Sequence, residues 1–289
     1  MTLAISSALV SGLIGRQCPQ WAGLPIKPVV SAGTDNALFQ LGTDFCVRMP
    51  KAEWSTTLIR KEAEWLPKLH HQLPLAIPEL AWLGAPDKTF PWPWAVYHWL
   101  AGNDAISHPP TDTVQAAIDL GAFVRALHDR DPEAGPRAGA INFYRGVPLS
   151  LRDTPTRQGI ARISDEFDTH ALLGAWDTAL AVPRWAARGV WVHGDLHAGN
   201  LLTHNGRLSA VLDFGGLGVG DPAVDLMPGW TLFSGDARER FRIAVGADDH
   251  TWGRARGWTL SVAVVALAHY RGSNEALAQA SRRALESVL

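Results

Sequence analysis

Two aspartates and an asparagine lie close together in one segment of the chain, WVHGDLHAGNLLTHNGRLSAVLDFGG. Asp195 and Asn200 follow a short apolar run, and Asp213 ends the next apolar run, directly before Phe-Gly-Gly. Phosphoryl transfer from a nucleotide needs a group that orients and deprotonates the attacking hydroxyl, and oxygen ligands for the divalent metal that neutralises the phosphates. Two carboxylates and an amide oxygen supply this set, and Mg²⁺ favours a few hard protein oxygens. The pattern is typical of a Mg²⁺-dependent phosphoryl-transfer site.

The same segment places His193, Asp195 and His197 at alternate positions. Alternate side chains of an extended strand project from one face, and His and Asp are common metal ligands, so a metal-dependent hydrolase is an alternative interpretation. That interpretation leaves Asn200 and Asp213 without a role. We therefore favour phosphoryl transfer and expect His193 to steady the loop.

The run HGDLHAGN resembles the catalytic loop H-G-D-x-x-x-x-N of the aminoglycoside phosphotransferase and choline kinase-like family, and LDFGG resembles the D-F-G segment of that family. The resemblance implies a small-molecule kinase in which Asp195 is the catalytic base, Asn200 and Asp213 hold Mg²⁺, and ATP or GTP is the phosphate donor. The run GDPAVDL resembles a further family segment. This implies that Asp225 holds the catalytic loop through hydrogen bonds, with Asp221 as another supporting carboxylate.

The phosphate-binding cation of this chain departs from the family pattern. In the family a strand lysine binds the phosphates and pairs with an acidic residue on a neighbouring helix. The matching position here is Arg48, in FCVRMP, and the expected partner is Glu62, in IRKEAEWL. Arginine keeps the positive charge and offers a planar fork to phosphate oxygens, but it is longer than lysine and not equivalent to it. The phosphate geometry is therefore expected to differ, while the charge is retained.

The resemblance implies that two further segments bind the nucleotide. The loop SAGTDN, residues 31–36, is not the G-x-G-x-x-G flap of protein kinases, but it stands in the place of the shorter nucleotide loop of small-molecule kinases. Ser31 and Thr34 are expected to approach phosphate there, together with backbone N–H groups. The run WAVYHWL is expected to be the hinge strand, where the backbone edges of His98 and Leu100 meet the purine.

The first hundred residues combine strands with one main helix. An apolar stretch at the N-terminus suits an amphipathic helix, and alternating apolar and polar residues around the turns SAGTDN and LGTD predict a hairpin over residues 28–50. Apolar residues at helical spacing predict a helix over residues 57–73, which Pro74 ends. After a Pro-rich connection, residues 93–102 form a short apolar strand that ends in Gly102.

The rest of the chain is mainly helical. Residues 111–130 carry apolar residues at helical spacing behind a Thr or Asp cap, and residues 156–182 are also expected to be helical. Two short β runs, residues 190–195 and 208–215, are joined by the polar turn THNGR, and helices are expected from about residue 222 onward.

This order of elements and the resemblance predict an α+β protein with a bilobal protein-kinase-like fold. The small N-terminal lobe, residues 1–99, is expected to contain a β-sheet with one main helix and to bind the nucleotide. The larger, mainly helical C-terminal lobe, residues 100–289, is expected to carry the catalytic and substrate-binding residues.

The composition excludes several other classes of protein. A chain of 289 residues with 47% hydrophobic residues can bury a substantial core, and its formal charge of −2 includes no basic stripe that would indicate a nucleic-acid partner or an anionic membrane. The two cysteines stand alone, without the spacing of a zinc site or a disulfide framework. No apolar run is long enough to span a bilayer, and the N-terminus lacks the basic residues of a signal peptide. We expect a cytoplasmic protein that is a monomer or weak dimer.

The phosphate acceptor does not follow from these motifs. The resemblance implies a small molecule with a hydroxyl group: an aminoglycoside, a macrolide, choline, a sugar or homoserine. A polycationic aminoglycoside favours clustered carboxylates, of which ISDEFD and ADDH offer some, whereas the 13 tryptophans leave room for a bulkier, more apolar acceptor such as a macrolide. A nucleotide-binding pseudokinase without transferase activity is a further alternative. The presence of Asp195, Asn200 and Asp213 together speaks against it.

Overall fold

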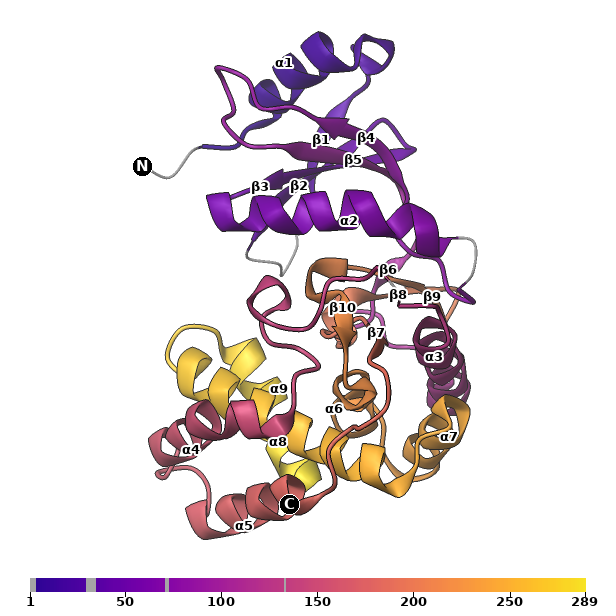
Figure 1. Ribbon diagram of the computed structural model, residues 1–289. Coiled ribbons are helices and arrows are strands. Elements are labelled where there is room, and N and C mark those ends of the chain that lie inside the picture. Colours follow the sequence, from indigo (N-terminus) through magenta and orange to yellow (C-terminus); the bar gives the residue numbers. More distant parts are fainter. Residues whose placement is uncertain (1–3, 30–34, 71–72, 133) are drawn as a thin grey trace.

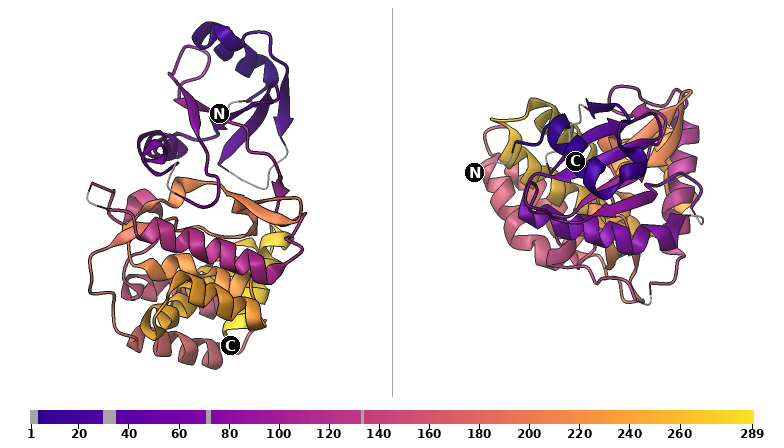
Figure 2. Two further views of the ribbon diagram at one scale, coloured as in Figure 1. Left: turned by 90° about the vertical axis from the view of Figure 1, so that its right-hand side faces the viewer. Right: turned by 90° about the horizontal axis from the view of Figure 1, so that it is seen from above.

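The computed structural model describes residues 4–29, 35–70, 73–132 and 134–289, which form two lobes stacked one above the other (Figures 1 and 2). The upper lobe in Figure 1 is a sheet with a helix on either side, and the lower lobe is mainly helical. This arrangement confirms the predicted α+β, bilobal class. No helix of the described ranges is long and apolar enough to cross a membrane.

The N-terminal lobe contains one antiparallel five-stranded sheet, with the strands in the order β1-β2-β3-β5-β4. Its elements are α1 (Ser7–Gln17), β1 (Ile26–Val29), β2 (Asn36–Leu41), β3 (Phe45–Pro50), α2 (Thr56–Leu69), β4 (Leu80–Gly84) and β5 (Trp94–His98). The hairpin of β2 and β3 turns at the predicted LGTD sequence, where Gly42 adopts a φ of 62°. The left-handed region costs glycine no Cβ clash, so this residue suits the turn.

Successive side chains of strand β3 point to opposite sides of the sheet, so its two faces have different neighbours. Val47 and Met49 are fully buried in an apolar cluster that also contains Val10 and Leu13 of α1. Arg48, which lies between them in sequence, therefore points to the other face, where α2 lies (Figure 1). The alternation of side chains along β3 thus points Arg48 toward α2, the helix that carries its expected partner, Glu62.

Helix α2 has the predicted apolar stripe. Its buried residues include Leu58, Trp65, Leu66 and Leu69. The helix ends at Leu69 and not at residue 73, which corrects the predicted end. Pro67 lies in the last turn and, because it lacks an N–H group, donates no hydrogen bond to the preceding turn.

Strand β4 was not predicted, because its sequence LAWLG lies inside the segment interpreted as a Pro-rich connection. It is an edge strand with a β-bulge between Leu80 and Trp82, and Trp82 and Leu83 are both exposed. The bulge and the exposed apolar side chains remove the period-two pattern by which a half-buried strand is recognised.

The C-terminal lobe contains most of the helices. They are α3 (Thr113–His128), α4 (Asp153–Arg162), α5 (Thr169–Ala181), α6 (Pro228–Thr231), α7 (Gly235–Val245), α8 (Asp249–Tyr270) and α9 (Glu275–Val288). The prediction for residues 111–130 is confirmed by α3, whose N-cap Asp112 accepts a hydrogen bond from the N–H of Gln115 at 2.9 Å. Residues 156–182 are two helices, α4 and α5, and not one continuous helix.

Short strands line the top of the C-terminal lobe, below α2 in Figure 1. They are β6 (Asn103–Asp104), β7 (Val190–Val192), β8 (Leu201–His204), β9 (Arg207–Val211) and β10 (Gly218–Gly220). The turn THNGR joins β8 to β9, whereas β7 pairs with β10. This corrects the prediction that THNGR joins the two β runs directly: β8 lies between them and was interpreted as part of the loop.

The apolar core of the C-terminal lobe reaches the helix above it. Phe123 of α3, Trp176 of α5 and Trp258 of α8 are fully buried in it, and Ile59 and Trp65 of α2 belong to the same cluster. Helix α2 therefore packs between the sheet of its own lobe and the top of the other lobe. Any residue on its lower face is close to the segments that follow β7 and β9.

Candidate active site

The loop between β7 and β8 carries the HGDLHAGN run, and a buried carboxylate fixes its backbone. Asp225 is fully buried, and its two oxygens accept hydrogen bonds from the N–H of His193 at 2.8 Å and of Gly194 at 2.7 Å. His128 of α3 lies 3.2 Å from the same carboxylate. These contacts confirm that Asp225 holds the loop. The second supporting carboxylate, Asp221, lies next to Arg254, with 2.8 Å between Oδ2 and Nε.

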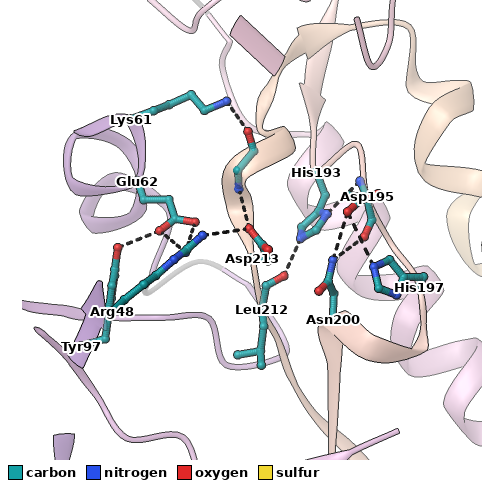
Figure 3. Close-up of polar contacts among 11 residues, drawn as sticks. Arg48, Lys61, Glu62, Tyr97, His193, Asp195, His197, Asn200, Leu212 and Asp213 are labelled. Atoms are coloured by element: carbon teal, nitrogen blue, oxygen red, sulfur yellow. Dashed lines mark hydrogen bonds and ion pairs between the residues drawn. The ribbon is translucent and has the colours of Figure 1, made fainter. Parts of the chain in front are cut away.

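His193 uses both ring nitrogens inside the loop. Nδ1 accepts a hydrogen bond from the N–H of Asp195 at 3.2 Å, and Nε2 lies 2.9 Å from the carbonyl oxygen of Leu212 (Figure 3). A backbone N–H can only donate and a carbonyl can only accept, so Nδ1 is the acceptor and Nε2 the donor in these two contacts. His193 therefore steadies the loop as expected and has no nitrogen left for a metal. In the part of the chain that the structure describes, no three His, Cys, Asp or Glu residues are grouped as metal ligands.

Asp195 lies at the mouth of the loop with its side chain 41% exposed. The Nδ2 of Asn200 donates to the backbone oxygen of Asp195 at 2.9 Å and lies 3.4 Å from its Oδ2 (Figure 3). The other carboxylate neighbours are Arg145, at 3.4 Å, and His197, at 3.7 Å. Although burial acts to raise it, His197 and Arg145 hold the pKa of Asp195 below its ordinary value. This carboxylate is therefore ionised at neutral pH.

Asp213 follows Leu212 just beyond the end of β9 and has a left-handed backbone conformation, with a φ of 58°. Non-glycine residues adopt this conformation only where the surroundings enforce it, commonly at functional sites. Its Oδ1 accepts a hydrogen bond from the N–H of Gly215 at 3.2 Å and lies 3.3 Å from Nη2 of Arg48. The side chain is 44% exposed, so part of the carboxylate remains open beside these contacts.

The loops that carry Asp195 and Asp213 are in close backbone contact. Gly194 has a φ of 82°, and a Cβ on Gly216 would lie 2.6 Å from the carbonyl oxygen of His193. Real Cβ atoms essentially never approach backbone this closely, so only glycine fits at position 216 without movement. The glycine of the HGD run and the second glycine of the FGG run therefore allow the two acidic loops to meet.

Asp195 and Asp213 line the same pocket between the lobes, which we call the interlobe pocket. Its other walls include Asp35 and Leu58 of the N-terminal lobe and Phe143 and Arg145 of the C-terminal lobe. The structure thus brings the predicted base, Asp195, together with both predicted metal ligands: Asn200 by direct hydrogen bond and Asp213 across the pocket.

Arg48 and Glu62 form the predicted ion pair beside this pocket. Nη1 of Arg48 lies 2.8 and 2.7 Å from the two oxygens of the fully buried Glu62, and the hydroxyl of Tyr97 donates to the same carboxylate at 2.7 Å (Figure 3). Although burial disfavours its charge, Glu62 and Asp213 raise the pKa of Arg48 above its ordinary value. Burial and Glu62 likewise raise the pKa of Tyr97.

All three nitrogens of the Arg48 guanidinium have protein partners. Nη1 bonds Glu62, Nη2 lies 3.3 Å from Asp213, and Asn36, with its amide oxygen facing the guanidinium, accepts from Nη2 at 3.1 Å and from Nε at 3.0 Å. A lysine has one nitrogen and cannot span these partners. The arginine in the place of the family lysine is therefore matched by its own set of acceptors.

Lys61 is a site residue that the sequence did not predict. It is 5% exposed, and its Nζ donates to the carbonyl oxygens of Gly215 at 2.6 Å, Leu217 at 3.0 Å and Ile141 at 3.2 Å. Burial lowers its pKa to about 8, although Glu62 acts in the opposite direction. Because its partners are backbone carbonyls of distant segments, no motif marks this residue; only its place beside Glu62 could have drawn attention to it.

The other residues predicted to contact the nucleotide are Ser31, Thr34, His98 and Leu100. Ser31 and Thr34 lie outside the described residues. His98 is exposed at the end of β5, where its N–H donates to the carbonyl oxygen of Glu79 at 2.9 Å, and Leu100 follows it, partly buried, where the chain leaves the sheet. Their contact with a purine stays a prediction.

Comparisons with known proteins identify the fold and the family of the chain. No curated protein sequence matches the chain. Among solved structures, it is similar to the GDP complex of wild-type aminoglycoside 2'-phosphotransferase-IIIa, with 18% identity, a TM-score of 0.73 and 98% of each chain covered. It is also similar to the macrolide 2'-phosphotransferase MphH from Brachybacterium faecium, with 25% identity, a TM-score of 0.65, and 94% of this chain and 97% of that chain covered. A macrolide 2'-phosphotransferase type I shares 21% identity, with a TM-score of 0.66 and 98% of each chain covered.

A family model gives the assignment. The model of the phosphotransferase enzyme family matches residues 28–258, a range that includes β2, β3, α2 and both acidic loops. Most of the chain lies within this match. The protein therefore belongs to the phosphotransferase enzyme family.

Proposed function

We propose that the protein transfers the γ-phosphoryl group of ATP or GTP to a hydroxyl group of a small molecule, with Asp195 as the catalytic base. The observation that carries this proposal is the position of Asp195: it is ionised, partly exposed and fixed at the mouth of a pocket that it shares with Asp213. A hydroxyl that enters the pocket can donate its hydrogen bond to this carboxylate. The carboxylate then orients the hydroxyl oxygen toward the phosphoryl group and takes its proton.

Asn200 and Asp213 fit the role of Mg²⁺ ligands. The amide nitrogen of Asn200 donates to Asp195, so its oxygen is the atom that it offers to a metal. The carboxylate of Asp213 is half-exposed beside the interlobe pocket. Two hard oxygens with room for phosphate and water suit Mg²⁺, which when bound would neutralise charge on the phosphates.

We propose that residues 1–99 form the nucleotide-binding lobe and residues 100–289 the catalytic and acceptor-binding lobe. Solved structures with similar folds contain GDP or ADP, which supports a nucleotide as donor. Arg48 supplies the positive charge near the phosphates. Because all three of its guanidinium nitrogens have protein partners, Asp213 or Asn36 must release Nη2 before Arg48 can bond a phosphate oxygen.

The acceptor belongs to the hydroxyl-bearing small molecules. An aminoglycoside and a macrolide are both candidates, because the similar structures are named as enzymes for one or the other. A pseudokinase is disfavoured because the base, both metal ligands and the Arg48–Glu62 pair are all present and brought together.

The direct test is transfer to a panel of acceptors. The purified protein is incubated with Mg²⁺ and ATP or GTP, and each acceptor is examined by mass spectrometry for a phosphate-sized gain in mass. We expect such a gain for at least one acceptor, with nucleotide consumption that depends on that acceptor. Nucleotide binding without transfer to any aminoglycoside, macrolide, sugar or amino alcohol would favour the pseudokinase instead.

A further inference from the structure

A turn of the C-terminal lobe, residues 139–146 with the sequence GAINFYRG, carries exposed apolar and aromatic side chains and lies beside Asp195. We call it the acceptor turn. Ile141, Phe143 and Tyr144 are 49%, 45% and 51% exposed, although large apolar side chains are ordinarily covered. Phe143 and Tyr144 both have left-handed backbone conformations, with φ values of 57° and 58°. Two consecutive non-glycine residues in this region store strain that the surroundings must support.

The acceptor turn is held by buried polar contacts. Asn142 is 1% exposed, and its side chain accepts from the N–H of Gly139 at 2.8 Å and donates to the carbonyl oxygens of Arg145 at 2.8 Å and Gly216 at 3.3 Å. The carbonyl oxygen of Ile141 accepts from Lys61 at 3.2 Å. The turn is therefore anchored to the loop of Asp213 and to α2, which carries Glu62. These hydrogen bonds fix the backbone that carries the exposed side chains of the turn.

Two side chains of the acceptor turn, Phe143 and Arg145, lie next to the carboxylate that any acceptor must reach. Phe143 and Arg145 line the interlobe pocket with Asp195, and Nη2 of Arg145 lies 3.4 Å from Oδ1 of Asp195. Across the lobes, Trp54 is 49% exposed and meets Phe143 edge-on, with 6.0 Å between the ring centroids. A hydroxyl bonded to Asp195 consequently places the rest of its molecule against an aromatic surface and a guanidinium.

The charges next to the base include basic groups that repel a polycation, although Asp35 and Asp213 also line the interlobe pocket. The basic groups Arg145 and His197 flank Asp195. The acidic residues that sequence suggested for polycation binding are used elsewhere: Asp165 pairs with Arg271, Glu166 pairs with Arg282, and Asp168 caps α5.

The second acidic run is used in the same way. Asp248 is the N-cap of α8 and accepts a hydrogen bond from the N–H of Thr251, and Asp249 pairs with Arg242. Carboxylates that are paired with arginine or that cap helices add little net attraction for a cationic ligand.

We propose, on the basis of the proposed function, that the acceptor turn selects the phosphate acceptor: Phe143 binds an apolar face next to the reacting hydroxyl, and Arg145 disfavours acceptors with several positive charges. The substrate class is then a hydroxyl compound with a large apolar face and at most one positive charge. Arg145 acts as a specificity-determining residue that the acceptor hydroxyl displaces from Asp195.

The test compares two classes of acceptor with matched variants. Wild type, Arg145→Gln, Phe143→Ala and Phe143→Tyr are assayed for kcat and KM with a macrolide that carries a single amine and with kanamycin, which carries several. Arg207→Gln is the control, because Arg207 is 66% exposed and pairs only at the surface with Asp119. Unchanged nucleotide affinity shows that each variant is folded.

The expected results separate the two side chains. Wild type should prefer the macrolide in kcat/KM. Arg145→Gln should raise kcat/KM for kanamycin about tenfold through loss of like-charge repulsion. Phe143→Ala should raise KM for the macrolide about tenfold with kcat little changed. Phe143→Tyr keeps the aromatic ring, so its KM for the macrolide should stay close to that of wild type.

Other outcomes overturn the inference. The inference is wrong if the wild type prefers kanamycin and Arg145→Gln leaves that preference unchanged. It is also wrong if Arg145→Gln lowers kcat equally on both acceptors, because Arg145 would then act in the transfer step. Absence of transfer to any acceptor of the wider panel would instead overturn the proposed function, on which the inference rests.

Discussion

At the scale of single residues, the site is organised around charged groups that pair with one another. Arg48 bonds Glu62, Asp213 and Asn36, and Tyr97 completes the shell of Glu62. Removal of one partner from such a buried group costs more than the bond itself is worth, because the other partner is left without compensation. The arginine is therefore integral to this site, and the family lysine would not be a simple replacement for it.

This gives a prediction for Arg48→Lys. The ammonium group cannot reach Glu62, Asp213 and Asn36 together, so we expect a loss of about 1–3 kcal/mol in the free energy of unfolding and weaker nucleotide binding. Urea denaturation, with Arg207→Lys as a surface control, measures the first effect. A midpoint equal to that of wild type would show that the guanidinium contacts contribute nothing that an ammonium cannot supply.

At the scale of elements, two short loops and one helix assemble the site. Asp225 fixes the loop after β7, Asp213 begins the loop after β9, and Lys61 of α2 binds the carbonyl oxygens of Gly215 and Leu217 in that second loop. The loops touch through glycine, since a Cβ at Gly216 would lie 2.6 Å from a backbone oxygen. The spacing between Asp195 and Asp213 thus depends on backbone contact, not on side-chain packing alone.

The matching prediction concerns Gly216→Ala. The added methyl group must push apart the loops that carry Asp195 and Asp213, so we expect kcat to fall at least about tenfold, since small displacements of reacting groups are costly. Gly174→Ala is the control, because nothing lies within 4 Å of a Cβ at this helical position and alanine is the better helix former. Steady-state kinetics of both variants measure the difference. Activity retained by Gly216→Ala would show that loop contact does not set the geometry.

The elements that sequence predicted are those with regular periodicity or local capping signals. The hairpin of β2 and β3, helix α2 and helix α3 carry such signals, as does the acidic motif that contains Asp195 and Asn200. Strand β4 was missed because its edge position and bulge remove alternation, and β8 because it directly follows the catalytic loop.

Contacts between distant segments could not be predicted from local pattern. Lys61, Asn142 and Arg145 act on groups roughly 50 to 155 residues away in sequence, as the pairs Arg145–Asp195, Asn142–Gly216 and Lys61–Leu217 show. No spacing rule connects such residues. The motif therefore indicated Asp195, Asn200 and Asp213, whereas the side chains that surround Asp195 appeared only in the folded structure.

At the scale of the whole molecule, the site lies where two lobes meet, and α2 joins them. Its Glu62 binds Arg48 within the N-terminal lobe, and its Lys61 binds carbonyl oxygens of the C-terminal lobe (Figure 3). The ring contact between Trp54 and Phe143 also crosses the lobes. Movement of one lobe against the other would therefore change the relative positions of Arg48, Asp213 and Phe143 together.

The most direct test of the account is single-turnover phosphoryl transfer by Asp195→Asn. The amide has nearly the same shape as the carboxylate but cannot accept the proton, so the rate of transfer should fall by about 10²- to 10⁴-fold while the Kd for ATP or GTP stays within about twofold of wild type. Asp119→Asn, which alters a surface ion pair, should transfer at the wild-type rate. A wild-type rate in Asp195→Asn would contradict the assignment of the base.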